Sequence, residues 1–127
     1  MNLDFSDDQK QLKTEARRFL EAKCPPARVR DVLEGRAGAY DEGLWRAVAA
    51  QGWLGAAIPE AHGGLGLGRL ELCVIAEELG RALAPIPFAS TLYFLAEAVM
   101  LAGDEGQKAD ILPRIAAGEL IGALAAA

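Results

Sequence analysis

The stretch RLELCVIAEELGRAL, residues Arg69–Leu83, decides the fold class of this chain. Its large apolar side chains recur at Leu72, Ile75, Leu79 and Leu83, with charged residues between them. Spacings of three and four residues place these side chains on one face of an α-helix. Burying the four would contribute roughly 6–12 kcal/mol gross, at about 1.5–3 kcal/mol each. The stretch therefore predicts an amphipathic helix that packs on a core.

The composition extends this prediction to the whole chain. Ala and Leu together supply 43 of the 127 residues, whereas Val, Ile and Thr together supply 13. Ala and Leu favour helices, and β-branched residues favour strands. A chain of this length suits one domain. We therefore predict an all-α domain built as a bundle of about six helices.

Start and stop signals divide the chain into those helices. Ser6 followed by Gln9 has the spacing of a capping box, and Asp104 followed by Gln107 repeats it. Proline pairs and glycines end several of the segments. The expected helices are Asp7–Lys23, Ala27–Glu34, a segment that Asp41 begins and Gly52 ends, Arg69–Leu83, Phe88–Leu101, and a segment that Asp104 begins, Pro113 shortens or kinks, and Gly118 ends. Of these, Phe88–Leu101 is apolar almost all round, which predicts a central position.

Charge and cysteine content exclude several classes of protein. The formal net charge is −5, so a general nucleic-acid binder is not expected. Cys24 and Cys73 are the only cysteines and provide neither a disulfide framework nor a cysteine zinc site, which favours a cytoplasmic location. The acidic N-terminus lacks the pattern of a signal peptide. The longest apolar run, Phe88–Ala102, contains Glu97 and is too short to span a membrane.

Two conspicuous motifs carry little chemistry. Four glycines at positions 63, 64, 66 and 68 suggest a phosphate loop, but Arg69 breaks the G-x-G-x-x-G spacing, so a turn between helices is favoured. His62 is the only histidine and lacks the partners of a catalytic triad or a metal site. We expect it to be a loop residue with backbone hydrogen bonds, and we expect no metal.

Two polar pairs allow a structural and a functional interpretation. Glu77 and Glu78 are adjacent on a helix and point about 100° apart, so an acid–base pair is disfavoured and ion pairing with Arg81 is expected. Ser90 and Thr91 stand at the start of an apolar helix, where they either cap it or line an apolar ligand cavity. The residues alone leave both possibilities open for this second pair.

The last residues, Leu120–Ala127, are apolar and uncharged. Chain termini are commonly polar and frayed, whereas this segment calls for a partner surface that the chain does not contain. We therefore expect the chain to be a piece that stops at the start of a further structural element.

Five segments, in order, resemble the N-terminal helical domain of the acyl-CoA dehydrogenase family. They match the family's first helix, its LGWLG-like turn, its PEEYGGLG loop, its EELGR motif and its GxxxQKxxxLPxxxxGE motif. His62 stands where the family usually has tyrosine. The segments here are LDFSDDQKQLKTEARRFL (3–20), LW and QGWLG (44–45 and 51–55), PEAHGGLG (59–66), EELGR (77–81), and GDEGQK, LP and GE (103–108, 112–113 and 118–119).

The resemblance implies a three-domain flavoenzyme that desaturates acyl-CoA thioesters. In such enzymes a glutamate removes the α-proton, a hydride passes to FAD, and the electrons go on to an electron-transfer flavoprotein. The subunits usually form tetramers. Residues 1–119 would be the helical domain, and residues 120–127 would begin the first strand of a truncated middle β-domain. The family's catalytic glutamate belongs to a later domain, so no residue of this chain is assigned a catalytic role.

The resemblance also implies two sets of binding residues and leaves one rival. The acyl-chain cavity would be walled by Ile86, Pro87, Ser90, Thr91 and Phe94, and the flavin would lie near Leu124, Ala126 and Ala127. FAD is expected on the full-length protein and not on residues 1–127 alone. The rival hypothesis is a non-catalytic partner subunit or interaction module that retains only the helical domain. The acyl group's length and type are left open.

Overall fold

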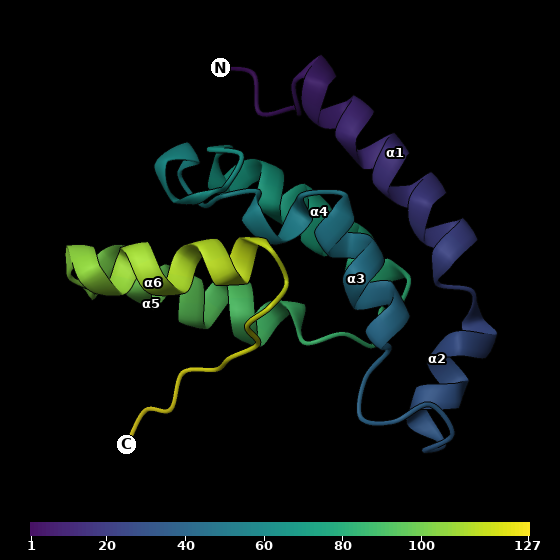
Figure 1. Ribbon diagram of the computed structural model, residues 1–127. Coiled ribbons are helices and arrows are strands. Elements are labelled where there is room, and N and C mark those ends of the chain that lie inside the picture. Colours follow the sequence, from purple (N-terminus) through teal and green to yellow (C-terminus); the bar gives the residue numbers. More distant parts are fainter.

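The computed structural model describes all residues, Met1–Ala127, as an assembly of helices (Figure 1). The chain forms six α-helices and no residue is in a strand, which confirms the all-α prediction. No helix combines the length and the apolar content that crossing a membrane requires. The elements are α1 (Asp7–Lys23), α2 (Pro26–Leu33), α3 (Glu42–Ala50), the 3₁₀ turns η1 (Trp53–Gly55) and η2 (Glu60–His62), α4 (Arg69–Arg81), the π-helix η3 (Ser90–Ala96), α5 (Glu97–Ala102) and α6 (Glu105–Ala116).

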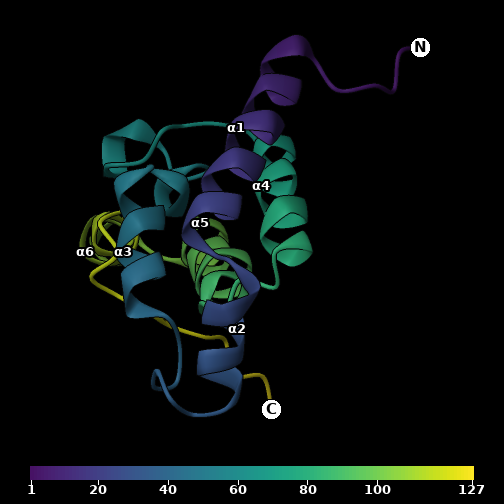
Figure 2. The same ribbon diagram turned by 90° about the vertical axis from the view of Figure 1, so that its right-hand side faces the viewer.

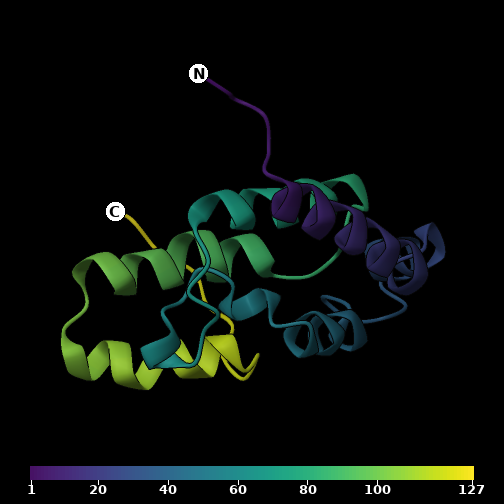
Figure 3. The same ribbon diagram turned by 90° about the horizontal axis from the view of Figure 1, so that it is seen from above.

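The helices form two packed pairs around one core. Helix α1 lies along α4, although the two are far apart in the sequence (Figures 1 and 2). The continuous helix η3–α5 lies beside α6 and runs in the opposite direction (Figure 3). Between α3 and α4, the turns η1 and η2 pack against α6, and the Trp53 ring contacts Phe19 of α1. The fully buried large side chains include Leu20, Leu44, Leu54, Ile58, Ile75, Leu112 and Ile115.

The helix caps form as the sequence predicts. Ser6 accepts the N–H of Gln9 at 3.2 Å, and the Gln9 side chain accepts the N–H of Ser6 at 2.9 Å. The same reciprocal pair forms between Asp104 and Gln107. Asp41 accepts the N–H of Leu44 at 2.9 Å and so caps α3. These short-range signals satisfy N–H groups that the first turn of a helix leaves without partners.

The ends of α2 and α4 differ from the expected ones, whereas α6 ends just before Gly118, as predicted. Helix α2 begins at Pro26 rather than Ala27, because proline is favoured in the first turn, where its missing N–H has no partner to lose. Its last residue, Leu33, is 78% exposed. Pro113 does not shorten α6, which continues to Ala116.

Leu83 does not join the buried face of α4, so the predicted burial of all four large side chains is wrong. The helix ends at Arg81, and Leu83 adopts φ +52° and is 70% exposed. Its N–H bonds to the C=O of Gly80, while Ala84 N–H bonds to the C=O of Leu79. This is a Schellman ending with leucine in the position that glycine usually takes. The left-handed residue turns its side chain out to solvent.

The helix expected at Phe88–Leu101 has a different internal geometry. Its central part, η3, is π-helical, and only the following residues, Glu97–Ala102, form α5. One side of the helix is buried, while Phe94 and Leu101 on the other side are 54% and 72% exposed. Within this chain the helix is therefore covered on one side only. π-Helical turns are rare and frequently accompany functional sites.

The last eight residues form no secondary structure. A strand requires hydrogen bonds to a neighbouring strand, and residues 120–127 pair with no other strand. The strand and the domain boundary expected there stay predictions.

Candidate functional site

The five residues expected to wall a cavity lie at the start of the helix formed by η3 and α5. Ile86 and Pro87 precede the helix and are half-buried, and Ser90 begins η3 and is also half-buried. Thr91 is completely buried, whereas Phe94 is more than half exposed. The structure therefore divides these five residues among different environments.

Ser90 and Phe94 provide an accessible surface. The Ser90 hydroxyl donates to the C=O of Pro87 at 3.4 Å, which keeps it close to its own backbone. The Phe94 ring, four residues further along, is 54% exposed. A large aromatic ring loses substantial hydrophobic stabilisation when left in water, so this side of the helix suits contact with an apolar surface or ligand.

Ile86 belongs to a separate groove. This groove has a volume of about 260 Å³ and lies between α4 and the start of the next helix. Its walls are apolar and include Leu79, Phe88 and Tyr93, but neither Ser90 nor Phe94. The predicted cavity residues are thus not gathered around one cavity within this chain.

Thr91 is directed toward the C-terminal segment. Its hydroxyl accepts the N–H of Gly122 at 3.2 Å and donates to the C=O of the same residue at 3.3 Å. Neither capping nor an accessible cavity wall describes this arrangement. Sequence reasoning missed the pairing because the two residues are far apart in the sequence, and spacing carries no signal for such a contact.

Tyr93 is a second feature that the sequence did not reveal. Its hydroxyl oxygen is buried and has no hydrogen-bond partner in the structure. Burial raises the pKa of Tyr93 to about 12, so the neutral phenol persists. The ring makes an edge contact with Phe88 at 5.8 Å between centroids. A buried hydroxyl without a partner is unfavourable, so this position carries an energetic cost within the chain.

The residues expected near a flavin, Leu124, Ala126 and Ala127, are all exposed. No backbone N–H or C=O group of residues 123–127 forms a hydrogen bond within the chain. These groups are free to bind a polar ring edge or a neighbouring strand. Their predicted role is compatible with this arrangement.

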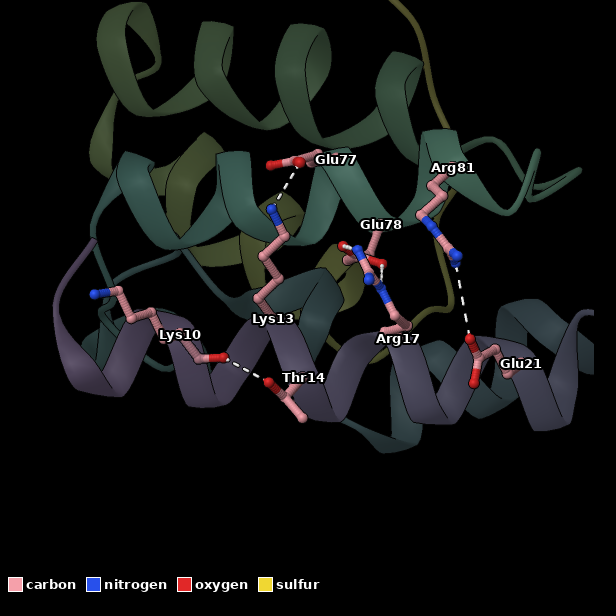
Figure 4. Close-up of polar contacts among 8 residues, drawn as sticks. All are labelled: Lys10, Lys13, Thr14, Arg17, Glu21, Glu77, Glu78 and Arg81. Atoms are coloured by element: carbon pink, nitrogen blue, oxygen red, sulfur yellow. Dashed lines mark hydrogen bonds and ion pairs between the residues drawn. The ribbon is translucent and has the colours of Figure 1, made fainter. Parts of the chain in front are cut away.

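Glu77 and Glu78 form ion pairs with α1 rather than with Arg81, so the expected partner is wrong (Figure 4). Glu78 is only 1% exposed and receives two hydrogen bonds from Arg17, at 2.9 and 3.1 Å. These bonds lower the pKa of Glu78. Lys13 pairs with Glu77 at 2.7 Å, and Arg81 reaches Glu21 at 3.9 Å. The expected structural role is confirmed, because the pairs join α1 to α4.

The glycine loop and His62 also have structural explanations. A Cβ atom on Gly64 would lie 2.0 Å from the C=O oxygen of Ile58, so the loop folds too tightly for a side chain there. The N–H of His62 donates to the C=O of Pro59 within a single 3₁₀ turn. No group of three or more His, Cys, Asp or Glu side chains is placed to hold a metal ion.

The comparisons with known proteins agree with this arrangement of helices. Residues 6–119 match the acyl-CoA dehydrogenase N-terminal domain. The chain is 34% identical to acyl-CoA dehydrogenase FadE26 of Mycobacterium tuberculosis, over 94% of this chain and 31% of the relative. It matches a chain of the ChsE4-ChsE5 complex from the same organism with a TM-score of 0.75 and 29% identity, over 94% of this chain and 30% of that chain.

A third relative, solved with FAD, is the acyl-CoA dehydrogenase from Bacillus anthracis. It has a TM-score of 0.75 and 29% identity, over 91% of this chain and 20% of that chain. Together, the fold and these matches define an N-terminal helical domain of the acyl-CoA dehydrogenase type. The chain belongs to the acyl-CoA dehydrogenase family, as its sequence motifs predict. It spans about a third of the length of FadE26.

Proposed function

We propose that this chain is the N-terminal domain of a flavin-dependent acyl-CoA dehydrogenase, which desaturates an acyl-CoA thioester between its α- and β-carbons. The observation that carries the proposal is the side of η3 that exposes Phe94, together with the unpaired backbone that follows Gly122. Both are surfaces that the chain leaves uncovered. By the resemblance of the sequence to the family, these two surfaces would be the acyl-binding and flavin-binding segments.

The side of η3 that exposes Phe94 would form part of the acyl-cavity wall. Pro87, Ser90 and Phe94 would contact the acyl group directly, with Ile86 beside them and Thr91 behind them. An apolar wall with few polar groups suits a long or branched hydrocarbon and excludes water from it. The reacting glutamate belongs to another part of the full-length protein, and no residue of this chain takes its role.

The segment after Gly122 would hold one edge of FAD, through Leu124, Ala126 and Ala127. When bound, the flavin supplies the hydride acceptor for the reaction. The solved relative from Bacillus anthracis contains FAD, which supports this cofactor. The free N–H and C=O groups of residues 123–127 are the chain's own contribution to that site.

We further propose that the full-length protein is cytoplasmic, transfers its electrons to an electron-transfer flavoprotein and forms a homo- or hetero-oligomer, most simply a tetramer. A relative solved as the ChsE4-ChsE5 complex supports association between different subunits. Exposed leucines and Phe94 give this domain apolar surface for such contacts.

The decisive experiment compares the flavin content of the full-length protein with that of residues 1–127. The longer protein should be yellow, with about one FAD per chain, and the shorter one colourless. Anaerobic addition of straight-chain, branched and polycyclic acyl-CoA thioesters should bleach the flavin for the preferred class. Stoichiometric flavin on residues 1–127 alone would contradict the assignment of the cofactor site.

The two-subunit relative also favours a second candidate, a non-catalytic partner subunit that uses this domain for assembly. This alternative predicts that the full-length protein binds no flavin alone and gains activity only with a second subunit. Bleaching of a purified single-chain protein by acyl-CoA would exclude it. The residues encoded after Ala127 provide a rapid check, because a catalytic glutamate is required only by the first candidate.

A further inference from the structure

Thr91 forms an unusually complete contact with one distant residue. Its side chain is 0% exposed, and the single hydroxyl satisfies both the N–H and the C=O of Gly122. A threonine hydroxyl has one donor and can accept at the same time, so this geometry uses it fully. Within the chain Gly122 has no other backbone hydrogen bond. Thr91 therefore provides the polar attachment of the C-terminal tail, residues 118–127, at Gly122.

Gly122 also lies unusually close to the helix. A Cβ atom at this position would be 2.2 Å from a terminal methyl carbon of Leu95, so a side chain would have to displace Leu95. Leu95 and Thr91 are four residues apart within η3. Gly122 thus rests between two residues of the π-helical segment, in contact with one and hydrogen-bonded to the other.

The tail is fixed at successive points up to Gly122 and not beyond it. The C=O of Gly118 accepts the indole N–H of Trp45 at 3.0 Å. The N–H of Leu120 donates to the C=O of Arg114 at 3.2 Å, and its side chain packs against the core. After Gly122 the backbone forms no internal hydrogen bond, and Leu124 is 56% exposed. The contact with Thr91 is therefore the last fixed point of the chain.

We propose that Thr91 is a positioning residue: its hydroxyl holds Gly122 on η3 and so sets the direction in which residues 123–127 leave the helical domain. The same helix turn carries Ser90, which belongs to the proposed acyl wall. The contact would thereby couple the position of the flavin-binding segment to that of the acyl wall. Only this coupling rests on the proposed function, whereas the attachment of the tail does not.

Hydrogen exchange of residues 1–127 tests the attachment. Thr91→Val keeps the shape of the side chain and removes the hydroxyl, so we expect the Gly122 amide to exchange about tenfold faster. Thr91→Ser keeps the hydroxyl and should restore slow exchange. Ser90→Ala is the matched control, because the Ser90 hydroxyl bonds only within its own turn. Amides of α1 and α4 should be unaffected in all three variants.

Flavin spectroscopy of the FAD-loaded full-length protein tests the coupling. Thr91→Val should change the visible circular dichroism of the flavin and raise the Kd for FAD about tenfold, and Thr91→Ser should restore both. Unchanged exchange at Gly122 in Thr91→Val would overturn the attachment. Faster exchange with unaltered flavin dichroism and Kd would overturn the positioning role. A full-length protein without flavin would contradict the proposed function, while the exchange experiment would still decide the attachment.

Discussion

At the scale of single residues, the buried carboxylate of Glu78 depends on an ion-pair partner for its stability. Its charge is stable in the interior only because Arg17 donates two hydrogen bonds to it (Figure 4). The neighbouring pair of Lys13 and Glu77 joins the same two helices, but Glu77 is 54% exposed. Water screens that second pair, so it contributes little. The two pairs therefore provide a matched comparison.

Arg17→Ala should lower the Tm by about 5–10 °C at neutral pH, because it leaves a buried charge without a partner. Lys13→Ala, the control, should change the Tm by only a degree or two. Thermal unfolding followed by circular dichroism measures both. Equal losses in the two variants would mean that burial of Glu78 has no energetic consequence.

The pH dependence of the same variants follows from the lowered pKa of Glu78. A carboxyl with a depressed folded-state pKa stabilises the fold above its unfolded value, and that contribution disappears as the pH falls through the folded value. In Arg17→Ala, burial favours the protonated acid instead. The difference in Tm between the unmodified chain and Arg17→Ala should therefore shrink as the pH approaches 4.

At the scale of elements, the glycine at position 64 in the loop is required by the packing, whereas the glycine at position 80 in α4 is replaceable. Gly64 allows the chain after η1 to fold back against Ile58 at a distance that no side chain permits. Gly80 lies inside α4 with no atom within 4 Å of the position a Cβ would take. The sequence shows both as glycine, and only the packing separates a required glycine from a replaceable one.

Gly64→Ala should destabilise the domain by about 3 kcal/mol or more, because the new methyl group would overlap the Ile58 backbone. Gly80→Ala should stabilise it by about 0.5–1 kcal/mol, the difference between glycine and alanine in a helix. Urea unfolding gives both free energies. A tolerated alanine at position 64 would show that the loop does not pack as described.

At the scale of the whole molecule, the two cysteines report on the integrity of the core. Cys73 is exposed, whereas Cys24 is 4% exposed and belongs to the central cluster. Burial raises the pKa of the Cys24 thiol, which further disfavours the reactive thiolate. The two thiols should therefore differ in reactivity for as long as the domain stays folded.

One thiol per chain should react rapidly with a disulfide reagent such as DTNB, and the second should react only at the rate at which the domain opens. Cys73→Ser should abolish the rapid phase, and urea should make both thiols rapid. Two rapid thiols in the native protein would show that Cys24 is not buried as the structure indicates.

The sequence by itself determined the fold class, most helix limits, the caps and the family. The fold class, the helix limits and the caps depend on interactions between residues close in sequence: apolar spacing and capping at Ser6, Asp41 and Asp104. The family was indicated by the order of the motifs. Only the tertiary structure decided that Glu78 pairs with Arg17 and that Thr91 holds Gly122. Those contacts join positions whose spacing carries no signal, since they exist only after the helices pack and exclude water from between them.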